Sequence, residues 1–191
     1  MKTTKKGFTL IELIVVIAII GVLAAILVPS MLGYVRKSKI SSANSTASSV
    51  QKAFESTLTD ADAKGVKLTY KGWIKIKGGT MTAETLSNGN ASDLLYSGVM
   101  NYFEKFKKVD GAVYIRNSSC VAVVATTDGN YIGTYPSGYV DAKDYKGNGE
   151  LKDGGSTALA KVVSRIVADK QDDANNPDGP EVDANNQPTA W

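Results

Sequence analysis

The chain has 191 residues, a formal net charge of +3, one Cys and no His. This length allows one modest globular domain. A single Cys excludes an internal disulfide framework, and the absence of His removes the commonest general base and metal ligand. Three lysines in the first seven residues account for the net charge, because without them 19 basic residues face 19 acidic ones. This balance argues against a general nucleic-acid-binding surface.

A long apolar stretch follows the basic start. From Leu13 to Val35 there are 23 residues without a charge, which as a helix would span about 35 Å, enough to cross a bilayer core. Basic residues flank both ends, and we expect the N-terminal lysines on the cytoplasmic side. Three interpretations compete here: a secretory signal peptide, a plain membrane anchor, and an anchor in which the carboxylate of Glu12 has a function.

A short motif separates these interpretations. Residues 5–13 read Lys-Lys-Gly-Phe-Thr-Leu-Ile-Glu-Leu. This resembles the processing site of type IV pilins and pseudopilins, in which a basic leader ends in Gly and Glu is the fifth residue of the mature chain. The apolar run with Gly21 and Pro29 also matches the helix of that family. The likeness covers about residues 2–55, and beyond residue 60 only the layout is compatible.

The resemblance implies a role for each residue of the motif. A prepilin peptidase would cut between Gly7 and Phe8 on the cytoplasmic face and methylate the new amine of Phe8. Glu12 would meet that amine on the preceding subunit during assembly, and Thr9 would add a hydrogen bond. A carboxylate near a buried amine offsets the cost of burying the charge. Phe8 and Glu12 are about 6 Å apart along a helix, which favours a partner on another chain.

Two residues predict weak points in the apolar helix. Pro29 lacks an N–H and clashes with the carbonyl of Ala25, so a kink is expected. Gly21 has low helix propensity. The resemblance implies that the helix between these positions can open in an assembled filament, and a simple membrane-helix kink is the alternative.

Shifts in composition predict the domain organisation. Apolar residues from Leu32 to Leu58 recur at spacings of three and four, so one helix should run from about Thr9 to about Thr59. The C-terminal tail is rich in Asp, Asn and Pro and is expected to be disordered or loosely docked. The expected segments are a leader (1–7), a transmembrane or filament-core helix (8–35), its amphipathic continuation (36–60), a globular head (61–170) and a polar acidic tail (171–191).

The first part of the head should hold a hairpin and a helix. Alternating apolar residues over 66–70 and 74–76 predict a short hairpin that ends at Gly78-Gly79. Ser92 is a candidate N-cap for a helix that runs to about Lys108.

The clearest strand pattern lies in the middle of the head. Residues 112–116 and 120–126 are predicted strands, and Asp128-Gly129 is a predicted hairpin turn into residues 131–135. A second turn leads to Tyr139-Val140, and Ser156 would cap a last helix to about Lys170. The expected fold class is therefore α+β. A long N-terminal helix, membrane-spanning in its first half, packs on an antiparallel meander of three or four strands, with extra head helices.

Other patterns carry weaker signals. Asp141, Asp144 and Asn148 are weak candidate calcium ligands, but Lys146 stands where the EF-hand order needs an oxygen, and a polar loop is the alternative. We predict no other metal and no cofactor. Cys120 lies in a β-branched run and should be buried and inert.

Aromatic residues in the head offer one further possibility. Tyr131, Tyr135 and Tyr139 recur at a spacing of four, with Trp73 elsewhere in the head. If exposed, they would suit stacking on sugar rings, but cross-strand packing is the stronger interpretation.

No catalytic constellation is present in the sequence, so we expect no enzyme. The resemblance implies a structural subunit of a type IV pilus that supports adhesion and motility. Its partners would be copies of itself, the prepilin peptidase, the assembly platform with its ATPase, and the membrane, with no specific nucleic acid. It would lie in the inner (cytoplasmic) membrane before assembly and in a cell-surface pilus afterwards. Two alternatives stay open: a pseudopilin of a type II secretion or competence system, and a membrane-anchored glycan-binding adhesin.

Overall fold

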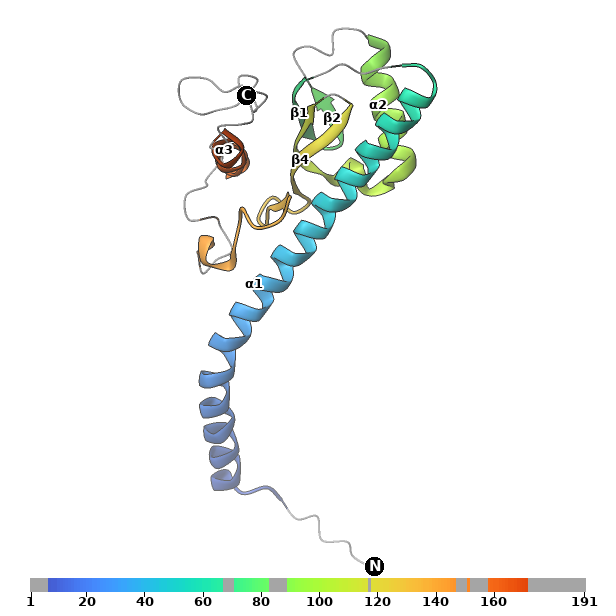
Figure 1. Cartoon of the computed structure of the whole chain (residues 1–191). Helices are drawn as coiled ribbons and strands as arrows, with labels where there is room; N and C mark the ends of the chain where they lie inside the picture. The colour runs from blue at the N-terminus through green and yellow to red at the C-terminus, as the bar shows by residue number, and fades with distance from the viewer. Residues whose placement is uncertain are drawn as a thin grey trace, which may run out of the picture.

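The computed structural model describes residues 7–66, 71–82, 89–116, 118–146, 151 and 158–171. A long helix leads into a head that contains strands and shorter helices, which confirms the α+β class. Figure 1 shows this helix extending well beyond the head. The elements are α1 (Leu10–Ala63), β1 (Lys71–Lys77), β2 (Thr80–Thr82), α2 (Gly89–Tyr102), the 3₁₀ helix η1 (Glu104–Lys108), β3 (Asp110–Arg116), β4 (Ser119–Thr126), β5 (Gly133–Tyr135), the 3₁₀ helix η2 (Ala142–Asp144) and α3 (Ala158–Gln171).

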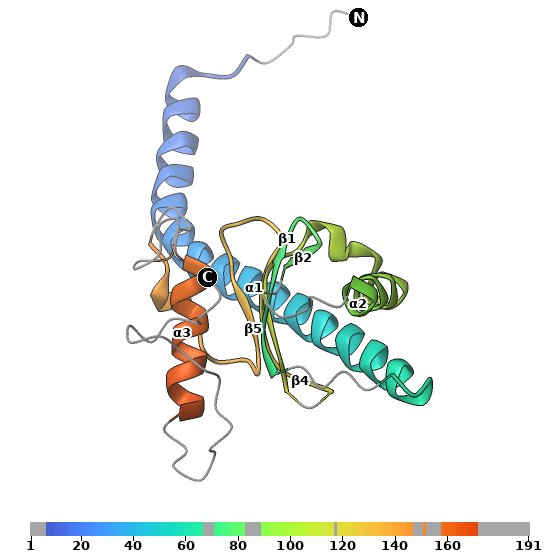
Figure 2. The same ribbon diagram turned by 90° about the horizontal axis from the view of Figure 1, so that it is seen from above.

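The helix α1 is continuous over 54 residues and passes through Gly21 and Pro29. Its ribbon changes direction between the blue N-terminal part and the cyan part at the head (Figures 1 and 2). A bend is the usual result of a proline inside a helix. The helix also runs past the expected end near Thr59, because Ala61 continues the apolar row and is buried in the head.

The sheet has five strands in the order β2-β1-β3-β4-β5, and all neighbours are antiparallel. The predicted central strands are confirmed as β3 and β4. The predicted hairpin is shifted, because Gly78-Gly79 forms the turn between β1 and β2 and does not end the hairpin. Residues 67–70 lie outside the described residues. Tyr139-Val140 forms no strand. The chain is irregular there and places the buried side chain of Val140 against residues of the sheet.

The helices of the head also differ from the prediction in detail. Ser92 lies inside α2, which begins three residues earlier, and the helix ends at Tyr102. The chain then tightens into η1, which places the fully buried side chain of Phe106 in the core. The last predicted helix is confirmed as α3, but its proposed cap Ser156 and the polar tail after Gln171 lie outside the described residues.

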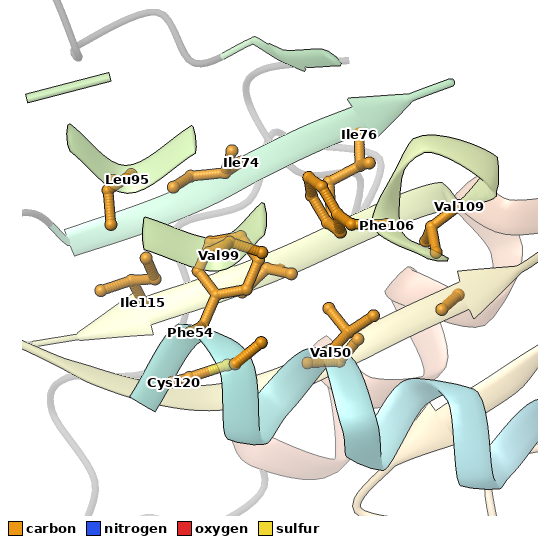
Figure 3. Packing of buried hydrophobic residues seen from close by; sticks show 14 of the residues in the cluster. Val50, Phe54, Ile74, Ile76, Leu95, Val99, Phe106, Val109, Ile115 and Cys120 are labelled. Atoms are coloured by element: carbon orange, nitrogen blue, oxygen red, sulfur yellow. The ribbon is translucent and has the colours of Figure 1, made fainter. Parts of the chain in front are cut away.

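The sheet is covered on both faces (Figure 2). Side chains of β3 alternate between two buried clusters: Val113 and Ile115 face α1 and α2, while Ala112 and Tyr114 face α3. Figure 3 shows the first cluster, where Phe54 of α1 meets residues of the sheet. The ring of Phe106 meets that of Phe54 edge-on, with centroids 6.0 Å apart. The head is therefore a three-layer α/β/α unit.

Candidate processing and assembly site

The start of α1 is closed by a reciprocal pair of side chains. The Thr9 backbone N–H and hydroxyl both donate to Oε2 of Glu12, at 2.9 and 2.6 Å, and the Glu12 N–H donates to Oγ1 of Thr9 at 3.3 Å. This is a capping box, which satisfies backbone donors that have no partner within the helix. The family resemblance implied only a supporting hydrogen bond from Thr9; its role as the N-cap was not predicted, although the Thr-x-x-Glu spacing carries that signal.

The expected cleavage position lies immediately before this cap. Gly7, Phe8 and Thr9 form no helix, so the bond between Gly7 and Phe8 lies outside the regular hydrogen-bond pattern of α1. The Phe8 side chain is 80% exposed. Leaving aside its chain neighbours, no heavy atom of the described residues lies within 4 Å of the position that a Cβ would occupy on Gly7. The chain itself therefore offers an enzyme open access to this bond.

The first half of α1 exposes apolar side chains around its whole circumference. From Phe8 to Val35, the large apolar residues are exposed, and no other part of the described chain covers them. The most apolar window has a mean hydropathy of 3.2, and the helix is long enough to cross a membrane. A helix that is apolar all round needs a membrane or a bundle of other helices to cover it. This part of the molecule is therefore built to be buried by something other than its own head.

The structure places Glu12 against Thr9 and not against a terminal amine. In the uncut chain the nitrogen of Phe8 is an amide, so the charged partner expected from the sequence does not yet exist. Oε1 of Glu12 takes no part in the capping hydrogen bonds, because those bonds use Oε2 or the backbone N–H of Glu12. Pairing of Glu12 with an amine on another chain stays a prediction.

The weak calcium candidates have other contacts in the structure. Asp141 caps η2, and its backbone N–H donates to Oδ2 of Asp144 at 2.8 Å. The same Asp144 oxygen lies 3.5 Å from Nη1 of Arg165 in α3. Asn148 lies outside the described residues. Within the described ranges, no group of three or more His, Cys, Asp or Glu residues is placed to hold a metal ion. A calcium site in this loop stays a prediction.

The aromatic residues of the head divide between its two faces. Tyr135 packs against the first buried cluster, whereas Tyr131 and Tyr139 pack against the second. The ring of Tyr131 lies 5.0 Å from that of Tyr145, and the buried Trp73 lies 5.2 Å from Tyr114. These side chains form no shared exposed row. Packing explains them better than sugar binding does.

The single cysteine is buried, as expected from its β-branched surroundings. Cys120 is 2% exposed and lies in the first cluster. Burial raises the pKa of its thiol, and the nearby carboxylate of Glu55 raises it further. Because the thiolate is the reactive form, this cysteine is inert in the folded head.

Comparison with known proteins points to one class. Residues 2–28 match the family model described as the prokaryotic N-terminal methylation motif. The chain is 43% identical over 75 residues to a type IV major fimbrial protein FimA of Dichelobacter nodosus, covering 39% of this chain and 46% of the relative. A second FimA from that organism is 38% identical over 94 residues, covering 48% and 59%.

These matches concern only part of each protein. The chain spans about half the length of the curated relatives it matches. No solved structure matches it. The chain thus carries the type IV prepilin methylation motif on a pilin-like architecture of a long apolar helix and an antiparallel sheet.

Proposed function

We propose that this chain is a structural, non-enzymatic subunit of a type IV pilus. The observation that carries the proposal is the placement of the methylation motif. The accessible Gly7–Phe8 bond is followed directly by a capped helix whose first half is apolar on every side. Such a helix suits storage in a membrane and later burial among copies of itself. The fimbrial relatives support a surface filament over a pseudopilin or an isolated adhesin.

The proposed sequence of events uses the residues of the capping region. A prepilin peptidase cuts after Gly7 and methylates the amine of Phe8. The chain waits in the cytoplasmic membrane with its head outside, and an assembly platform with its ATPase then extracts it into a cell-surface pilus. In the filament, Glu12 accepts the methylated amine of a neighbouring copy. Once both groups are buried in an apolar setting, pairing offsets part of the cost of removing each charge from water.

The experiment that tests this proposal is peptide mass spectrometry on fibres sheared from cells. After tryptic digestion, the proposal predicts a peptide from Phe8 to Arg36 that is heavier by one methyl group, about 14 Da. Its abundance in fibres would support a pilus subunit. Recovery of that peptide from membranes alone would favour a pseudopilin, and a chain that keeps Gly7 joined to Phe8 in mature material would contradict the proposal.

A further inference from the structure

Four exposed lysines lie on two segments that pack together at the turn between β1 and β2. Lys77 ends β1, and Lys105, Lys107 and Lys108 lie on η1, whose backbone packs against the turn at Gly79. We call these four residues the lysine platform. The acidic residues in the same two segments and at the start of β3 are Glu104 and Asp110, so the platform keeps an excess of positive charge.

The platform is held rigidly by its backbone. The N–H of Gly78 donates to Oδ1 of Asp110 at 2.6 Å, and the N–H of Gly79 donates to the carbonyl of Val109 at 3.1 Å. A Cβ on Gly79 would lie 2.6 Å from Cα of Lys107, so the turn packs directly on η1. The buried ring of Phe106 fixes η1 in the core (Figure 3). The lysines are thus presented by one rigid unit, which reduces the conformational entropy that a partner must restrict.

The chain itself contains a segment of matching charge. Residues 172–183 hold Asp172, Asp173, Asp178, Glu181 and Asp183, and no Lys or Arg follows Lys170. We propose that the lysine platform binds this acidic segment of a neighbouring copy. The proposal rests on the filament described under the proposed function, because it needs copies held side by side.

Two features favour a neighbouring copy over the same chain. The acidic segment follows α3, which packs on the second cluster, whereas η1 packs on the first cluster through Phe106. The helix after which the segment begins therefore lies on the face of the sheet opposite to η1; Figure 2 places α3 and α2, which leads into η1, on opposite sides. A filament also needs contacts in which one patch meets a different patch on the next copy. Platform and segment supply two such patches.

The strength of this contact comes from the number of charges. A single exposed ion pair contributes little, but three or four pairs together change an equilibrium on the order of tenfold to a hundredfold. The contact would be repeated along the filament and weakened by salt. It would add to the packing of the N-terminal helices and need not replace it.

A cross-linking experiment tests which copy supplies the segment. Chains carrying K107C and chains carrying D178C are expressed together, and sheared fibres are treated with a mild oxidant. The native Cys120 is buried and stays out of the reaction. We expect a disulfide-linked dimer from the mixed fibres, and none when K52C, on an exposed part of α1, replaces K107C. Normal fibres without the dimer would overturn the proposal. A double variant that carries both K107C and D178C provides a second check. A cross-link that forms only within single chains of this variant would also overturn the proposal.

A charge-reversal experiment tests the chemistry. We expect K105E/K107E/K108E to lower fibre yield about tenfold and D172K/D173K/D178K in the same chain to restore it. The matched control K52E/K64E/K143E reverses three exposed lysines elsewhere and should leave yield unchanged. Loss without rescue would assign the platform to another anionic partner and overturn the proposal. Failure of the unaltered chain to enter fibres would instead contradict the proposed function itself.

Discussion

The carboxylate of Glu55 in α1 accepts the backbone N–H of Cys120 in β4 at 2.7 Å, across 65 positions of sequence. The same oxygen accepts the hydroxyl of Ser119 at 2.9 Å. One side chain thus holds the first residues of β4 against the long helix. Cys120 is buried directly beside it, so water cannot easily replace this acceptor for the Cys120 N–H.

Removal of this acceptor should loosen the head. We expect Glu55→Ala to lower the free energy of unfolding by about 1–3 kcal/mol, because a buried N–H loses its charged partner. For a protein of this size, that is a fall of roughly 2–12 °C in the thermal midpoint. Circular dichroism of the full chain in detergent measures it. Glu55→Gln keeps a carbonyl oxygen and should lose less. Equal midpoints for Glu55→Ala and the unaltered chain would remove the role given to this residue.

The loop between β4 and β5 should become less stable in acid. Desolvation of Asp128 raises its pKa, but N–H donors of Tyr131 and Asn130, each 3.0 Å away, the Thr126 hydroxyl and the charge of Lys39 lower it, and the net shift is downward. A lowered pKa in the folded state means that the carboxylate stabilises the fold at neutral pH. This contribution is lost as the pH falls below about 4, through the lower folded-state value.

The variant Asp128→Asn isolates that contribution. We expect it to be less stable than the unaltered chain in urea at pH 6, and we expect the difference to shrink at pH 3. A difference that stays constant across this range would show that the charge of Asp128 does not support the loop.

Gly133 should not tolerate a side chain. It lies in β5, where a Cβ would overlap the backbone carbonyl oxygen of Ala43 in α1. The next residue, Thr134, donates its N–H to the Asn44 side chain at 2.9 Å, which keeps the strand close to the helix. We expect Gly133→Ala to cost about 1–3 kcal/mol, the usual range for overpacking. Gly33→Ala, which meets nothing within 4 Å, is the control for urea unfolding of the head. Similar unfolding midpoints for the two variants would contradict this close approach.

Substitution of Gly7 should block processing without disturbing the fold. Among the described residues, none beyond the chain neighbours lies within 4 Å of a Cβ at this position, so Gly7→Leu meets none of the packed head. We therefore expect the uncut form to accumulate in membranes with an unchanged melting curve, because the side chain would obstruct the peptidase. Immunoblotting for the size of the chain measures this. Normal processing of Gly7→Leu would contradict the assigned cleavage position.

Variants of Glu12 should separate its two contributions. Glu12→Ala removes the charge and the side-chain acceptor of the two Thr9 donors but keeps the backbone N–H that donates to Oγ1 of Thr9. Glu12→Gln keeps an oxygen that can accept from Thr9. If the charge is needed to meet an amine on another chain, both variants should be cut normally and both should give few fibres. If only the hydrogen bonds from Thr9 to this side chain matter, Glu12→Gln should assemble like the unaltered chain. That result would remove the assembly role given to the charge.

Strong local patterns explain which elements the sequence predicted. The residues of α1 keep one apolar row across several turns, β4 is rich in Val, and β3 holds Val113, Tyr114 and Ile115 in succession, so their types were correct. The strands β1 and β2 are harder to predict because their pairing depends on the turn at Gly78-Gly79 and on contact with β3. The change from α2 to η1 accompanies burial of Phe106, which is a tertiary effect.

The same contrast applies to the candidate sites. The motif around Gly7 and Glu12 lies within a few residues, so its spacing could be read directly. The contact between Glu55 and Cys120 joins distant parts of the chain, and no local pattern indicates it. The lysine platform is equally hidden, because the end of β1 at Lys77 and the 3₁₀ helix η1 are brought together only by the turn that packs on η1.

The position of α1 in the head has a mechanical consequence. This helix contributes Ile40 to the cluster under α3 and residues from Ala47 to Ala61 to the cluster on the other face. A pull on its N-terminal half would therefore load both clusters together, in shear along the helix axis. Shear must displace many side chains at once, whereas peeling breaks contacts one by one. The head is anchored to its helix in the geometry that best resists tension.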